Sequence, residues 1–177
     1  RSSLSLAYHA RGQVDPDKMN AIQEHRGFAT VGHLQDYDGL TAAAVIYLRM
    51  WCDGAQTQAG VMNDLIDTLG TTRGHSAIAA LAELCSMCVR HGRRPLCRHG
   101  LKCRCVGADE ASFAHFVSTA ATGEREDAMM IAILLVRPDM APALTSLATD
   151  FGLALKQMNL AAPKAIAEMP NGQPVLH

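Results

Sequence analysis

The sequence predicts an all-α fold, and three features of the chain point to it. Apolar residues make up 49% of the 177 residues and aromatic residues only 5%, so alanine, leucine and methionine do most of the packing, which favours helices. Apolar positions recur at helical spacing, and no segment alternates apolar and polar residues as a half-buried strand would. A chain of this length can also bury a core without disulfides. We therefore expect one bundle of about six or seven helices.

The first half of the chain contains four expected helices. Asp15 and Pro16 suit the N-cap and first position of a helix that stops at Gly27. Asp53 and Gly54 end the second helix, and glycines also follow the third and fourth. These three helices are expected over 40–52, 56–69 and 72–91.

The second half is expected to hold three more helices. Asp109 is predicted to cap a helix that ends at Gly123, and Asp139 to cap a last helix that runs to about Met158. Between them, the segment 128–136 is apolar on all sides, so we expect it to be the most buried part of the fold. The expected organisation is a single domain over 1–160, with a metal-binding loop at 88–107 and an irregular, Pro-containing tail at 161–177.

Charge and cysteine placement restrict the cellular setting. The net charge is −1, so no global field draws the protein onto nucleic acid or an anionic membrane. The longest apolar run, 128–136, is about half of what a bilayer span needs, so no membrane association is expected. Four of the six cysteines lie within residues 88–105, which suits metal ligation in a reducing compartment better than long-range disulfides. We therefore expect a cytoplasmic protein.

The segment HGRRPLCRHGLKCRCVG, residues 91–107, is here called the basic loop. It contains the residues of the chain that are most suited to bind a metal ion or an anion. His99, Cys103 and Cys105 cluster in a polar, Gly-containing stretch that gives thiols no packing reason to gather. A structural zinc ion takes four Cys or His ligands, and the loop arginines favour the thiolates that it needs. As fourth ligand we favour Cys88, which would tie the loop to the preceding helix. The sequence therefore predicts one structural zinc ion.

Other interpretations of these cysteines stay open. Cys97 or Cys85 are alternative ligands. Cys85 and Cys88 also continue an apolar helical stripe, which favours core packing for Cys85 and leaves Cys88 evenly balanced between core and ligand. An iron–sulfur cluster is less favoured because its usual cysteine spacings are missing, and a disulfide within the loop is a further alternative. Asp109 and Glu110 could serve a catalytic zinc as general base, yet they more simply occupy a helix N-terminus, and no deaminase or H-E-x-x-H motif is present.

The basic loop also suggests a binding surface. Its candidate contacts for an anion or partner are Arg93, Arg94, Arg98, Lys102 and Arg104. No acid lies between Glu83 and Asp109, and no aromatic residue lies between Trp51 and Phe113 that could stack on bases. A protein partner is therefore favoured over a nucleic acid.

These observations together predict a function class. We expect a zinc-stabilised, non-enzymatic helical module whose basic loop contacts a macromolecular partner. The alternatives are a nucleic-acid-associated regulator that uses the same loop on phosphates, and a metalloenzyme or iron–sulfur or redox protein. No phosphate-binding glycine loop, dinucleotide motif or nucleophile elbow supports an enzyme.

Overall fold

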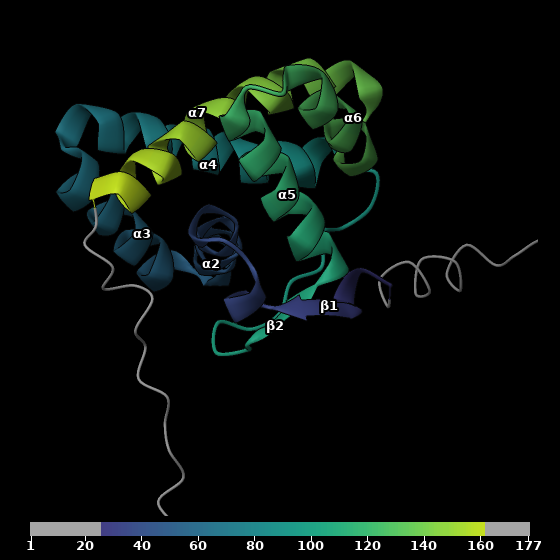
Figure 1. Ribbon diagram of the computed structural model, residues 1–177, viewed down its shortest axis with the longest axis horizontal. Coiled ribbons are helices and arrows are strands. Elements are labelled where there is room, and N and C mark those ends of the chain that lie inside the picture. The colour runs from purple at the N-terminus through teal and green to yellow at the C-terminus, as the bar shows by residue number, and fades with distance from the viewer. Residues whose placement is uncertain (1–25, 162–177) are drawn as a thin grey trace, which may run out of the picture.

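The computed structural model describes residues 26–161, and this part of the chain is predominantly helical, as predicted (Figure 1). Six α-helices lie entirely within residues 26–161: α2 (Gly39–Asp53), α3 (Ala55–Leu69), α4 (Thr71–His91), α5 (Ala108–Thr122), α6 (Arg125–Leu135) and α7 (Ala141–Ala161). Two 3₁₀ helices, η1 (Leu34–Asp36) and η2 (Pro138–Met140), precede α2 and α7. The helix expected from Asp15 lies almost entirely outside the described residues, and so does the tail beyond residue 161.

The helices pack around α5 and α7. Figure 1 shows α7 crossing the bundle, where it packs against both α4 and α5. The centre of the core is aromatic, with Phe113 and Phe116 of α5 and Phe151 of α7 fully buried. Gly152 of α7 allows this close approach, because a Cβ there would lie 2.7 Å from the carbonyl oxygen of Val117 on α5.

The expectation that 128–136 forms the most buried segment is wrong. Within α6 only Ala128 and Ala132 are buried, while the side chains of Met130 and Leu134 are 64% and 69% exposed. The reason is position: α6 lies at one end of the bundle and packs through a single face of small residues on α5 and α7. An apolar helix surface allows burial on every side but does not supply the neighbours that burial requires.

The C-termini of α2, α3, α4 and α5 fall at the expected glycines, whereas the cap of α2 was not predicted. Asp38 caps α2, since its carboxylate accepts hydrogen bonds from the backbone N–H groups of Leu40 and Thr41, both at 3.0 Å. Gly123 ends α5 in the left-handed conformation with φ of 88°. The prediction that Asp139 caps the last helix is wrong. Asp139 lies in η2 and pairs with Arg137, and α7 begins two residues later.

A small sheet was not expected from the sequence. β1 (Thr30–His33) pairs antiparallel with β2 (Cys105–Gly107), with His33 opposite Cys105 and Thr30 opposite Gly107. Strands of three or four residues are too short to show an alternating pattern. The sheet joins the end of the basic loop to the segment before α2. No helix within residues 26–161 is long and apolar enough to cross a membrane.

Candidate functional site

The basic loop connects α4 to β2 and is fixed at both ends and at its turn. Near α4, the Arg93 N–H donates to the carbonyl oxygen of Leu135 and the Arg137 N–H to that of His91, both at 3.1 Å. The loop then reverses at a turn, closed by a hydrogen bond from the Cys103 N–H to the Gly100 carbonyl at 3.0 Å. From there it returns as β2.

A buried ion pair lies beneath this turn. The Arg49 side chain of α2 is 1% exposed and the Glu110 side chain of α5 is 0% exposed. The Arg49 Nε donates to Glu110 Oε1 at 2.6 Å, and its Nη2 donates to Oε2 at 2.8 Å. This two-point geometry is the strongest form of the Arg–carboxylate interaction. It joins residues that lie 61 positions apart in the sequence.

Arg49 also binds the loop backbone. Its Nη1 donates to the carbonyl oxygens of Cys103 at 2.6 Å and Gly100 at 3.4 Å, and its Nη2 donates to that of Cys105 at 2.6 Å. Both ends of the turn are therefore held by one guanidinium. Because these carbonyl groups point inward to Arg49, they do not need water or a metal to be satisfied.

Glu110 completes the arrangement from the other side. Its carboxylate accepts hydrogen bonds from the backbone N–H groups of His99 and Gly107, each at 2.9 Å. Burial alone would raise the pKa of Glu110, but the hydrogen bonds from Arg49 and from these two N–H groups outweigh it and leave the pKa below its ordinary value. Glu110 is therefore held as a carboxylate, which balances the buried Arg49 charge.

Asp109 forms a second anchor and is not the N-cap that the sequence predicted. Gly107 occupies the cap position of α5. The Asp109 carboxylate turns toward the loop, where its Oδ2 accepts from Arg94 Nη1 at 2.6 Å and from the backbone N–H of Cys97 at 2.9 Å. The hydrogen bond to Asp109 raises the pKa of Arg94, although burial opposes it.

His99 links the loop to the segment before β1. Its ring stacks on Phe28 with a centroid separation of 6.1 Å. Its Nε2 lies 3.0 Å from the Phe28 carbonyl oxygen, and its Nδ1 lies 3.2 Å from that of Cys105. A neutral imidazole can donate from only one nitrogen. A metal would have to displace one of these two contacts.

The structure brings only part of the predicted zinc set together. The Cys103 Sγ lies 3.9 Å from His99 Nδ1, and Cys105 is on the adjoining strand. Cys88 is buried in the hydrophobic core, as is the alternative ligand Cys85. Within residues 26–161, no three or more His, Cys, Asp or Glu side chains are grouped so that they could hold a metal ion. Zinc binding therefore stays a prediction, whereas the core interpretation of Cys85 and Cys88 agrees with their burial.

The loop cations divide into engaged and outward-facing side chains. Arg94 pairs with Asp109, and Arg98 donates from Nη2 to the carbonyl oxygen of Cys52 at 2.7 Å. The side chains of Arg93, Lys102 and Arg104 are exposed, and none has an ion pair or hydrogen bond to another described residue.

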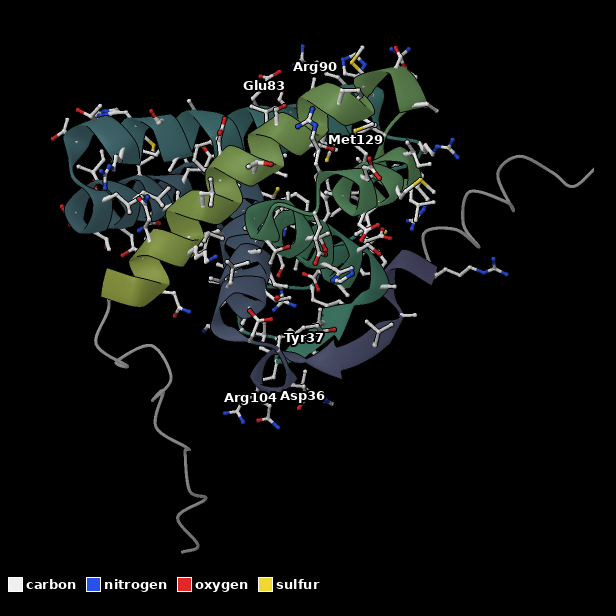
Figure 2. All side chains as sticks on the ribbon, turned by 45° about the horizontal axis from the view of Figure 1, so that its top comes forward. Asp36, Tyr37, Glu83, Arg90, Arg104 and Met129 are labelled. Atoms are coloured by element: carbon white, nitrogen blue, oxygen red, sulfur yellow. The ribbon has the colours of Figure 1, made fainter. Side chains whose placement is uncertain are left out.

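The cations at the two ends of the basic run, Arg90 and Arg104, lie at different ends of the molecule. Figure 2 labels Arg104 and Asp36 at the foot of the molecule, and Arg90 and Glu83 at the opposite end. Arg90 and Glu83 form an exposed ion pair at 2.6 Å.

Sequence reasoning missed Arg49, the residue that organises the site. It lies in the apolar run 40–52, on the same helix face as Val45, and is as buried as that valine. A charged residue at a core position must be paired, so its place in the apolar stripe was the available signal. The partner Glu110 could not be assigned from sequence because many acids were equally available.

A second surface feature is an open hollow of about 580 Å³ between η1, α2 and α5. Tyr37, Asp38, Ser112 and His115 contribute to its lining. Asp38 caps α2, and the Ser112 hydroxyl donates to the carbonyl oxygen of Ala108 at 2.9 Å. Among the described residues, no hydrogen bond joins Ser112 to His115 as a nucleophile would be joined to its base.

The fold and the site define a small helical domain with one structurally anchored basic loop. No protein-family model, curated protein or solved structure matches the chain.

Proposed function

We propose that the protein is a non-enzymatic interaction module that presents the tip of its basic loop to an acidic surface of another protein. The tip consists of Leu101, Lys102 and Arg104, which follow Gly100 in and after the turn. All three side chains are exposed, with Leu101 at 40%. The observation that carries the proposal is the contact of buried Arg49 with the carbonyl groups of Gly100 and Cys103 beneath them.

Rigidity is the physical reason to assign this tip a binding role. A loop that is ordered only on binding loses part of its interaction energy to conformational entropy, roughly 0.5–1.5 kcal/mol for each immobilised side chain. Here the turn backbone is held in advance by Arg49, and the backbone N–H of His99 is held by Glu110. The outward cations therefore start from a fixed backbone.

The composition of the tip favours a protein partner. An apolar side chain next to two cations can bury Leu101 in a pocket while Lys102 and Arg104 pair with carboxylates at its rim. A phosphate backbone would need several cations in a row. In the basic loop, Arg94 and Arg98 are already engaged, which interrupts such a row.

The experiment uses the full chain as bait in an extract of its native cells, with a charge-reversal variant of the tip. We expect Lys102→Glu/Arg104→Glu to lose retained partner by about tenfold or more, as for contacts worth at least roughly 1.4 kcal/mol. The matched control is Arg73→Glu/Arg125→Glu, which makes the same change in net charge at the exposed first turns of α4 and α6. Acids are favourable at these helix N-termini, so the control should stay folded.

Three outcomes decide the proposal. Loss of a nuclease-resistant protein partner in the tip variant but not in the control supports it. Equal loss in both variants means that only net charge matters and contradicts it. Binding of a duplex DNA or RNA probe that falls steeply with salt and is lost in the tip variant replaces it with the nucleic-acid alternative.

A further inference from the structure

The outer face of α6 is apolar and open at one end of the bundle. Among the described residues, the three most exposed large apolar side chains are Val89 at 86%, Leu134 at 69% and Met130 at 64%. Met130 and Leu134 lie one turn apart on α6, and Val89 lies in the last turn of α4. Two backbone hydrogen bonds of 3.1 Å join the ends of α4 and α6. The largest apolar exposures therefore fall on two elements that meet.

The burial along α6 is the reverse of what a helix at the surface of a monomer shows. Its two fully buried residues are alanines, Ala128 and Ala132, whereas the longer Met130 and Leu134 point to solvent. Burying a large apolar side chain stabilises a fold more than burying an alanine does, so a surface helix turns its large residues inward. The reversed order indicates that another surface covers the outer face of α6.

Charged residues of opposite sign stand at the two ends of this face. Asp127 lies in the first turn of α6, and Arg137 lies just beyond its C-terminus, and both are exposed. Asp127, Met130 and Leu134 follow one another at steps of three and four residues, which places them on one side of the helix. Arg137 follows three residues later. The face therefore runs from an acid through two apolar side chains to a base.

We propose that two copies of the protein pair through this face, with their α6 helices antiparallel about a two-fold axis at the level of Ala132. Met130 then packs against Leu134 of the second copy, and Asp127 lies opposite Arg137 of the second copy. One axis serves both pairs, because residues 130 and 134 have the same midpoint in the sequence as residues 127 and 137. A two-fold interface repeats every contact, so each pair occurs twice. This charge complementarity of the face with itself favours a second copy as the occupant.

The charged groups are available for this contact. Within residues 26–161 Asp127 has no ion pair of its own. Arg137 pairs with Asp139 at 3.1 Å, but both side chains are more than half exposed, and such a pair contributes little. Figures 1 and 2 show α6 on the side of the bundle away from β2, which follows the tip of the basic loop. A dimer through α6 therefore leaves the tips of both copies uncovered.

The test measures the mass of the full chain by sedimentation equilibrium over a wide range of protein concentration. Stable complexes bury roughly 1,200–2,000 Å² in total, and a pair of 11-residue helices supplies only part of that area, so we expect a weak, concentration-dependent dimer. Met130→Glu/Leu134→Glu should be monomeric at every concentration, because it places charges in the apolar centre of the interface.

The matched control is Met62→Glu/Leu153→Glu, which makes the same chemical change on α3 and α7. These side chains are 39% and 43% exposed. They are less exposed than Met130 and Leu134, so the control should lose at least as much stability as the test variant. It should nevertheless dimerise like the wild type. Circular dichroism of both variants verifies that they stay helical.

A charge exchange tests the antiparallel register without changing the apolar centre. In Asp127→Arg the new base meets Arg137 of the second copy, and in Arg137→Asp the new acid meets Asp127. Each variant alone should self-associate about tenfold more weakly, because two attractive pairs become repulsive. In an equimolar mixture, a dimer of one copy of each variant regains opposite charges at both pairs. The mixture should therefore associate about as tightly as the wild type.

Several results would overturn the proposal. These are a wild-type protein that is monomeric at millimolar concentration, a dimer that Met130→Glu/Leu134→Glu retains, equal loss in the control, and a mixture that associates no better than its components. If the wild type is monomeric and another protein is lost only from the Met130→Glu/Leu134→Glu variant, the face binds that protein instead. If NMR contacts join the Met130 methyl group to residues 1–25 or 162–177 of the same chain, those segments cover it.

Discussion

The Arg49 guanidinium and the Glu110 carboxylate face each other in the interior with two hydrogen bonds, at 2.6 and 2.8 Å, and together bind five backbone groups of residues 99–107. This pair therefore joins α2, α5 and the basic loop into one unit. Replacing a buried ion pair by apolar residues is often tolerated, but leaving one member unpaired is costly.

Removing one member of the pair should destabilise the protein strongly. We expect Arg49→Met or Glu110→Gln to lower the free energy of unfolding by about 3–5 kcal/mol, because each leaves a buried charge without its partner. Glu83→Gln is the control and should cost less than about 1 kcal/mol, since its ion pair with Arg90 is half exposed. Urea unfolding measures these values. Equal effects of Glu83→Gln and Glu110→Gln would contradict the central role of the buried pair.

The double variant Arg49→Met/Glu110→Leu, compared with the single variants Arg49→Met and Glu110→Leu, tests whether the two residues act as a unit. It removes both charges, so its cost should be smaller than the sum of the single costs by roughly 1–3 kcal/mol. The backbone groups of the loop nevertheless lose their partners. Amide hydrogen exchange at His99 and Gly107, whose N–H groups bind Glu110, should therefore become faster even in the double variant.

Acid should weaken the same anchor. The folded-state pKa of Glu110 is below its ordinary value, so its contribution is fully present above an unfolded pKa of about 4.3 and is lost as pH falls through the folded pKa. Burial would raise the pKa of Asp38, but its hydrogen bonds with Thr41 and Leu40 lower it. Asp38 therefore also contributes stability that is lost as pH falls. NMR titration of the wild-type side-chain carboxyl groups should show both midpoints below the values in the urea-unfolded chain. A Glu110 midpoint above its unfolded value would contradict the ion pair.

Local patterns in the sequence predict the helices, but not the contacts between them. The run that became α3 and the glycine that ends α5 follow from periodicity and from the conformational freedom of Gly123. The exposure of Met130 does not follow, since an apolar helix does not specify its neighbours. Arg49 pairs with an acid far away in the sequence, and the local pattern does not indicate which of the many acids it is. The strand β2 is too short to show the alternation of apolar and polar residues that predicts a sheet. The site is therefore the least predictable part of the fold.

Two glycine-to-alanine substitutions, one at the contact of α7 with α5 and one on α3, should change the free energy of unfolding in opposite directions. A Cβ at Gly152 would lie 2.7 Å from the Val117 carbonyl oxygen and 2.8 Å from the Ala121 Cβ, so Gly152→Ala must separate the helices and should cost about 1–3 kcal/mol. At Gly60 of α3 a Cβ meets only the Met50 side chain at 3.5 Å, an ordinary contact. Gly60→Ala should therefore stabilise by about 0.5–1 kcal/mol through helix propensity. Thermal unfolding of both variants checks this pair, and equal shifts would contradict the close α5–α7 approach.

Zinc binding by the loop is the prediction that needs the largest local change. A nitrogen ligand and a sulfur ligand of one tetrahedral zinc ion lie about 3.6 Å apart. This is close to the 3.9 Å between His99 Nδ1 and Cys103 Sγ. Metal binding at this nitrogen would release its contact with the Cys105 carbonyl oxygen, and Cys88 or Cys97 would have to leave its buried place to complete the set.

We expect metal analysis of the purified, reduced protein to find one zinc ion per chain. Cys103→Ser and Cys105→Ser should lose the ion, and Cys52→Ser, whose thiol lies outside the predicted set, should keep it. Because Arg49 and Glu110 bind the loop backbone independently, zinc loss should speed amide exchange in the loop while α2 and α5 stay folded. A metal-free wild-type protein whose His99 and Gly107 amides are already protected would contradict the zinc prediction. The buried ion pair alone would then account for the order of the loop.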